Sequence, residues 1–114
     1  MQGCFIELPA FERTREQYLD DDAYASLQSL MLLAPEAGDL IEGSGGLRKL
    51  RFRDARRGKG KRGGLRVIYF YWGGHAEFWL FALYAKGEVD DLSPRQLAAL
   101  REHLKSELKA RNFN

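Results

Sequence analysis

The sequence predicts a small α+β protein, in which a mainly antiparallel β-sheet carries packed helices in the order β-α-α-β-β-β-α. Its 114 residues, 45% of them apolar, suffice for one domain spanning residues 1–114 with a buried core. Apolar residues recur at helical spacing in two stretches, one before Pro35 and one after Pro94. Between these stretches the period changes to two, which is typical of strands.

The N-terminal part is predicted to contain an edge strand and two helices. Residues Cys4 to Leu8 alternate and end at a proline, as edge strands often do. The first helix is expected from about Phe11 to Leu19. The second opens in the aspartate cluster 20–22, which supplies an N-cap, and closes at Pro35. Its apolar residues are expected to face the core: Tyr24, Leu27, Leu30 and Met31.

Three strands are predicted next. The run Leu47 to Arg53 has a period of two: Arg48, Leu50 and Phe52 fall on one face, and Leu47, Lys49, Arg51 and Arg53 fall on the other. One face of this strand is therefore expected to be wet and cationic. The run Leu65 to Trp72 is almost wholly apolar and reads as a central strand. A turn at residues 73–75 then leads into a returning strand from Glu77 to Tyr84.

The last helix has the clearest start signal in the chain. Ser93 is the expected N-cap, Pro94 occupies the first helical position, and Gln96 follows three residues after the cap. A buried stripe is predicted at leucines 97, 100, 104 and 108.

Charge is strongly segregated along the chain, although the net charge is only +2. Residues 1–42 hold two arginines against nine carboxylates, whereas residues 43–66 hold ten lysines and arginines against Asp54 alone. The remaining residues balance six against six. This asymmetry indicates that the middle of the chain binds a polyanion.

Glycines and cations are concentrated in the connection from Arg56 to Gly64. The glycines allow the backbone to approach a bulky ligand, and the cations suit phosphate. No Gly-Lys here is followed by Ser or Thr, which excludes a Walker nucleotide loop. The alternative is a solvated hairpin tip whose charges only maintain solubility.

Arg66 is exceptional because it lies in an otherwise apolar strand. Burying an isolated guanidinium is costly, so either Arg66 faces solvent or a carboxylate at the strand's edge, or it is directed at an anion in a cleft. Tyr84 and Lys86 would come near Arg66 if the strands on either side of residues 73–75 form a hairpin.

Conventional acid-base pairs and metal sites are not suggested. His75 falls in a turn and His103 on the last helix, and both are expected at the surface. There is no metal-ligand cluster, and the single Cys4 cannot form an intramolecular disulfide. With neither a signal-peptide pattern nor a long apolar run, the protein is expected in the cytosol, with no membrane partner.

Three segments resemble the HigB branch of the RelE-type toxins: GGLRKLR (45–51), GKGKRGGLRVIYFYW (58–72) and LYAKGEVDDLS (83–93). The resemblance runs from about Gly38 to Leu92. It implies a RelE-like microbial-ribonuclease fold, no metal cofactor, and cleavage of mRNA in the ribosomal A site. It also implies inhibition by an antitoxin that often carries a helix-turn-helix domain, like HigA.

The resemblance also implies roles for individual residues. The family's catalytic arginine corresponds to Arg66, its loop lysines to Lys59 and Lys61, and its positions after the next strand to Tyr84 and Lys86. Arg66 would stabilise charge that develops on the phosphate when the 2′-hydroxyl attacks, and a lysine with a depressed pKa would act as base or acid. The remaining cations are expected to grip RNA: Arg48, Lys49, Arg51, Arg57 and Arg62.

The sequence is also compatible with two other functions. A noncatalytic RNA- or DNA-binding module would use the same basic face and exposed aromatics. A protein-interaction module would instead use the acidic N-terminal third.

Overall fold

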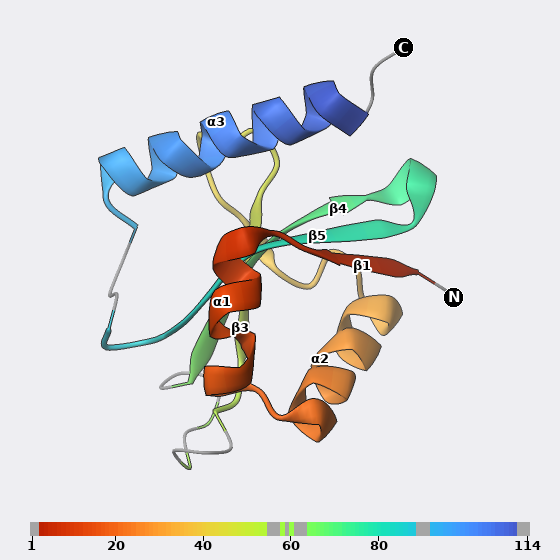
Figure 1. Cartoon of the computed structure of the whole chain (residues 1–114), viewed down its shortest axis with the longest axis vertical. Helices are drawn as coiled ribbons and strands as arrows, with labels where there is room; N and C mark the ends of the chain where they lie inside the picture. The colour runs from red at the N-terminus through yellow and green to blue at the C-terminus, as the bar shows by residue number, and fades with distance from the viewer. Residues whose placement is uncertain (1–2, 55–57, 59, 61–63, 89–91, 112–114) are drawn as a thin grey trace.

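The strand predicted to be central lies in the middle of a five-stranded sheet with the order β1-β5-β4-β3-β2 (Figure 1). The computed structural model describes residues 3–54, 58, 60, 64–88 and 92–111. Its elements are β1 (Cys4–Glu7), α1 (Pro9–Tyr18), α2 (Asp21–Leu33), β2 (Asp39–Leu40), β3 (Arg48–Phe52), β4 (Leu65–Trp72), the 3₁₀ turn η1 (Gly73–His75), β5 (Glu77–Ala85) and α3 (Pro94–Arg111).

The predicted α+β class is confirmed, and the sheet is mixed. β1 pairs parallel to β5, whereas the other described pairings are antiparallel. The prediction missed β2, since two residues are too few to show a period. β2 exists because Asp39 and Leu40 pair with Lys49 and Arg48 of β3, which is a tertiary interaction.

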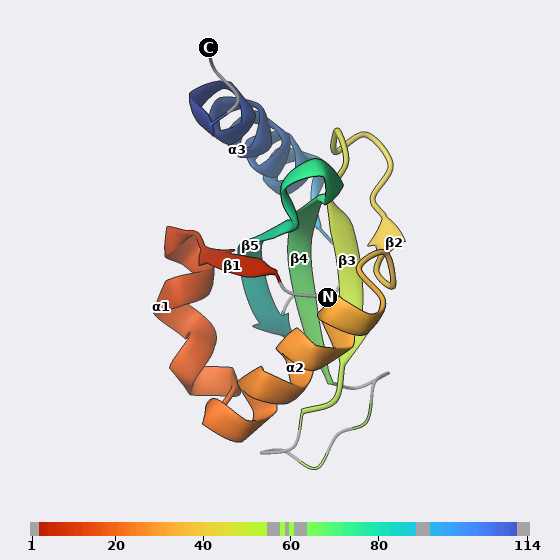
Figure 2. The same ribbon diagram turned by 90° about the vertical axis from the view of Figure 1, so that its right-hand side faces the viewer.

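Two apolar clusters pack on opposite faces of the sheet, with α1 and α2 on one side and α3 on the other (Figures 1 and 2). Successive residues of β4 pack alternately into the two clusters, and this strand is therefore apolar almost throughout. The α1/α2 side holds Phe11, Leu27, Met31, Leu50, Val67 and Leu80. The α3 side holds Leu47, Ile68, Trp79, Phe81 and Leu104.

The helix boundaries follow local chemistry. The Asp20 carboxylate accepts a hydrogen bond of 2.8 Å from Ala23 N, as predicted for the N-cap of α2. α1 begins two residues earlier than expected, because Pro9 fits the first helical turn. Within the described ranges, no helix combines the length and apolar character needed to cross a bilayer.

A β-bulge interrupts the pairing of β4 with β5. Ile68 pairs with Ala82, but Tyr69 pairs with Leu80, so Phe81 is an extra residue in β5. Phe81 and Ala82 consequently both belong to the α3 side. The bulge thus sets which side chains of β5 face α3 beyond this point.

Candidate nucleic-acid interface

Arg51, Arg66 and Tyr84 form one row across three neighbouring strands. Arg66 of β4 pairs with Arg51 of β3 on one side and with Tyr84 of β5 on the other. Residues directly opposite each other project to the same face, with Cβ atoms about 5 Å apart. Tyr84 packs with the α3-side cluster, so this row, called the Arg51–Arg66–Tyr84 row below, lies on that side.

Arg66 is almost completely covered, with 6% of its surface exposed. Its Nη1 donates a hydrogen bond of 3.1 Å to the carbonyl oxygen of Leu65. Desolvation lowers the pKa of the guanidinium below its ordinary value; the positive charge of Arg51 adds to this effect, and Tyr84 opposes it. An arginine nevertheless stays charged at neutral pH. Arg66 therefore carries its positive charge where little water screens it.

A narrow groove adjoins this row between β5 and the N-terminal half of α3. Its volume is about 250 Å³, and its lining residues are Ala82, Tyr84, Leu92, Gln96, Ala99 and Leu100. Tyr84 belongs to both features, so the groove opens next to Arg66. An apolar hollow thus lies beside a cationic surface.

Lys86 lies at the same end of the sheet as Arg66. Its backbone N–H donates a hydrogen bond of 2.9 Å to Gly64 O, which joins the end of β5 to the start of β4. The Lys86 side chain is exposed. The other predicted loop cations lie outside the described residues: Arg57, Lys59, Lys61 and Arg62.

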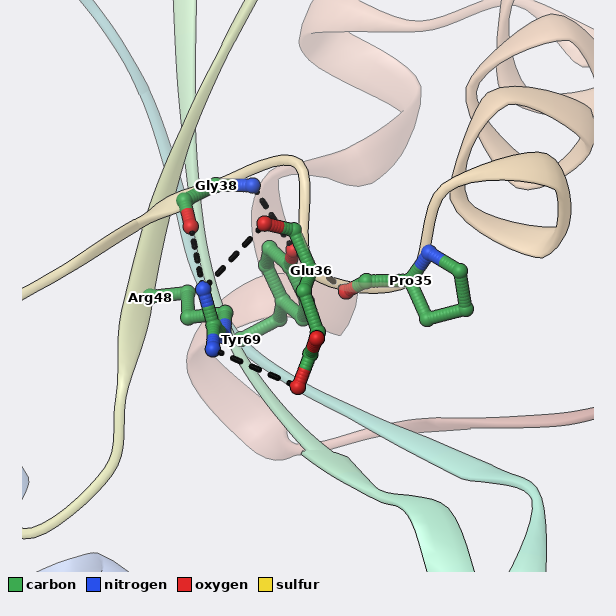
Figure 3. Close-up of polar contacts among 5 residues, drawn as sticks. All are labelled: Pro35, Glu36, Gly38, Arg48 and Tyr69. Carbon is green, nitrogen blue, oxygen red and sulfur yellow. Dashed lines mark hydrogen bonds and ion pairs between the residues drawn. The ribbon is translucent and has the colours of Figure 1, made fainter.

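Arg48 lies on the face of the sheet that α1 and α2 cover, and its guanidinium group is hydrogen-bonded within the chain (Figure 3). Nη1 donates to Gly38 O at 2.8 Å and to Glu36 O at 3.2 Å. Nη2 lies 3.6 Å from the Glu36 carboxylate. These bonds tie the connection between α2 and β2 to β3, so in this structure Arg48 has a structural role that its sequence position did not suggest.

Tyr69 binds the same connection between α2 and β2 (Figure 3). Its hydroxyl donates to Pro35 O at 2.8 Å and accepts from Gly38 N at 3.0 Å. Burial raises the pKa of Tyr69 above its ordinary value, so the hydroxyl remains a donor at neutral pH. These two side chains and their bonds to residues 35–38 form an Arg48–Tyr69 clamp.

Lys49 and Arg51 alternate with Arg48 and project to the α3 side, as their partners Ile68 and Arg66 require. Lys49 is half-buried and Arg51 is exposed. Lys49 and Arg51 thus form the predicted cationic face of β3. Arg48 lies on the opposite face, as predicted, together with the buried Leu50 and Phe52.

Gly64 is needed by the chain's own backbone. A Cβ at this position would lie 2.4 Å from Phe52 O and 2.5 Å from Gly60 O, so no side chain fits. Gly58, in contrast, has a positive φ of 66° with no atom near its Cβ position. Close packing between the ends of β3 and β4 thus explains Gly64 without any ligand.

The two histidines lie elsewhere. His75 is exposed in η1, at the opposite end of β4 from Arg66. His103, which was expected at the surface, is only partly exposed: its ring packs edge-on against Phe81, and Nε2 lies 3.8 Å from the Glu107 carboxylate. Neither histidine pairs with the Arg51–Arg66–Tyr84 row.

Sequence reasoning missed two residues near this interface. Asp54 was predicted only to contribute a negative charge. It lies just after β3, and 1% of its surface is exposed. Gln96, which was interpreted only as part of a helix cap, also lines the groove. The available signal for Asp54 was that it is the single carboxylate among the ten cations of residues 43–66.

No protein-family model matches the chain. Among the described side chains, no group of three or more His, Cys, Asp or Glu residues is placed to hold a metal ion.

Proposed function

We propose that this chain is an endoribonuclease toxin of the RelE/HigB type, which cleaves mRNA on the ribosome and is inhibited by a cognate antitoxin. The proposal includes the RelE-like topology and a cytoplasmic location. The observation that carries it is the Arg51–Arg66–Tyr84 row, in which a nearly buried arginine lies beside a second arginine and a tyrosine. Two guanidinium groups on one face suit a phosphate better than any neutral ligand.

The proposed reaction needs charge stabilisation above all. The 2′-hydroxyl loses its proton to a base and attacks the neighbouring phosphorus, while the bond from phosphorus to the 5′-oxygen breaks and that oxygen takes up a proton. The products are a 2′,3′-cyclic phosphate and a 5′-hydroxyl. Arg66 stabilises the negative charge on the phosphate oxygens, which is greatest in the transition state.

The proton carriers are proposed to be lysines. Lys86 lies at the Arg66 end of the sheet, and Lys59 and Lys61 precede β4 in the sequence. One of these amines is proposed to take the proton of the 2′-hydroxyl and another to protonate the leaving 5′-oxygen. Since such groups are weak catalysts, the ribosome is proposed to hold the mRNA in attack geometry, which can contribute several kcal/mol.

The test is single-turnover cleavage of an mRNA on programmed ribosomes, with the same RNA free in solution as the comparison. We expect rapid cleavage of the ribosome-bound message and slow cleavage of the free one. Rapid turnover on free RNA would contradict the dependence on the ribosome. Coexpression with a helix-turn-helix protein encoded next to the gene should restore growth to cells that express the chain.

The second candidate is a noncatalytic RNA-binding module. It is favoured by the exposed Arg51 and half-buried Lys49, which suit phosphate binding without chemistry. The same experiment separates the two functions, because a binding module would associate with RNA in a salt-dependent manner and leave it intact.

A further inference from the structure

The groove between β5 and α3 begins where the Arg51–Arg66–Tyr84 row ends. Tyr84 lines the groove and is the strand partner of Arg66. Ala82, two residues earlier in β5, forms part of the same lining. A ligand group attached to a phosphate at Arg66 therefore has an apolar recess next to it.

Gln96 brings a side-chain amide to this largely apolar recess. Gln96 Oε1 accepts a hydrogen bond of 2.9 Å from Ser93 N, and Gln96 N donates one of 3.1 Å to Ser93 Oγ. This reciprocal cap orients the side-chain amide. Within the described part of the chain, Gln96 Nε2 makes no hydrogen bond, so a donor remains at the edge of the groove.

We propose that this groove binds one nucleobase of the RNA, with Tyr84 offering an aromatic surface and Gln96 Nε2 donating to an acceptor on the base edge. The inference rests on the proposed function and adds to it a specificity site within the chain. A volume of about 250 Å³ lies below the range for drug-sized ligands, so it suits a single planar ring system.

Charge complementarity favours a nucleotide over an apolar peptide as the occupant. The groove is continuous with the row that holds the exposed Arg51, and an apolar peptide brings no phosphate to this cation. A nucleotide supplies the phosphate and the flat apolar ring in one covalent unit. Aromatic stacking and a few hydrogen bonds are how proteins usually read an unpaired base.

The direct test is binding of the four nucleoside 5′-monophosphates, with ribose 5-phosphate as the probe that lacks a base. Chemical shifts of the Gln96 side-chain amide and of the Ala82 and Leu100 methyl groups report on the groove. We expect nucleotides to shift these signals and to bind more tightly than ribose 5-phosphate. Equal affinities without shifts at the groove would overturn the proposal.

A variant that fills the groove tests the proposal, with a matched control elsewhere in α3. Ala99→Leu adds bulk at an exposed helical position that lines the groove, and leucine is a good helix former. It should weaken nucleotide binding about tenfold and leave ribose 5-phosphate binding unchanged. Ala110→Leu makes the same change at an exposed position of α3 outside the groove lining and should affect neither probe.

Gln96→Glu tests the specificity role. Glutamate retains the reciprocal cap with Ser93, so the thermal stability should not change. It replaces a donor by an acceptor, so the order of affinities among the four nucleotides should change. An unchanged order, with a uniform loss for every nucleotide, would show that Gln96 does not read the base.

Cleavage assays distinguish failure of this inference from failure of the proposed function. If nucleotides bind in the groove but ribosome-bound mRNA stays intact, the base site stands and the toxin function fails. If mRNA is cut and Ala99→Leu cuts it at the wild-type rate with unchanged sequence preference, the function stands and the base site is wrong. Nucleotide binding unaffected by Ala99→Leu is also the result expected if the groove holds a partner's peptide.

Discussion

Arg51 and Arg66 lie directly opposite each other on β3 and β4, although both carry a positive charge. Like charges at such a position destabilise a sheet. The charge of the exposed Arg51 is therefore a local electrostatic cost to folding, which a bound anion would reduce.

Removing one of these charges should therefore stabilise the free protein. In dilute buffer, Arg51→Gln should raise the free energy of unfolding by about 0.2–1 kcal/mol. It should also reduce the extra stabilisation given by inorganic phosphate. Urea denaturation with and without phosphate measures both effects. Arg13→Gln, a charge change on the exposed side of α1, is the control and should keep the wild-type response to phosphate.

Two cations on the α3 side of the sheet should have different effects when they are replaced: one on the cleavage rate, the other on RNA binding. Arg66→Ala should lower single-turnover cleavage on the ribosome roughly 100-fold or more, since it removes stabilisation needed in the transition state. Lys49→Ala should instead weaken binding and reduce the slope of log affinity against log salt by about one unit. Rate measurements and titrations at several salt concentrations test both variants.

The same experiment needs a check on folding, because Arg66 is nearly buried. Circular dichroism melts of Arg66→Ala and Arg66→Lys show whether the fold persists. A folded Arg66→Ala protein that cleaves at the wild-type rate would mean that the catalytic assignment is wrong.

Arg48 should behave as a structural residue. Arg48→Ala removes the bonds to Gly38 O and Glu36 O and should cost about 1–3 kcal/mol of stability. The cost should be partly shared with Tyr69→Phe in a double-mutant cycle, since both side chains hold residues 35–38 in the Arg48–Tyr69 clamp. If Arg48→Ala lowered the salt slope of RNA binding as Lys49→Ala does, Arg48 would contact phosphate as well.

Two glycines in the connection between β3 and β4 should differ sharply in their tolerance of a methyl group. Gly64→Ala places Cβ 2.4 Å from Phe52 O and forces the backbone to shift, which should cost about 1–3 kcal/mol. Gly60→Ala meets no atom within 4 Å and lacks a positive φ, so it should be neutral or slightly stabilising. Chemical denaturation compares them. Equal effects would mean that Gly64 is not under this packing constraint.

Stability should fall at high pH because of Tyr24. Burial, followed by the hydrogen bond to Glu7 and that residue's negative charge, raises the pKa of Tyr24 above its ordinary value of 10.0. The unfolded chain therefore releases this proton first as the pH passes about 10, and the stabilising contribution is lost from there upward. The free energy of unfolding of Tyr24→Phe should therefore fall less steeply than that of wild type above about pH 10. A curve parallel to wild type would contradict this cause.

Local sequence signals determined most of the elements. The apolar run of β4, the N-cap at Asp20 and the reciprocal cap of Ser93 with Gln96 each depend on neighbouring residues, so they are legible along the chain. The same is true of the segregation of charge into residues 43–66. These features sufficed to predict the α+β class and the position of the cationic face.

Tertiary pairing decided what the sequence left open. β2 forms because it pairs with β3, and Arg48, one of the cations predicted to grip RNA, bonds to Gly38 O in the Arg48–Tyr69 clamp. The row of Arg51, Arg66 and Tyr84 likewise depends on strand register and, with Gln96, on how α3 packs against β5. Such relationships join residues far apart in the chain, and no local pattern encodes them, because the free energy that selects them comes from packing the whole sheet.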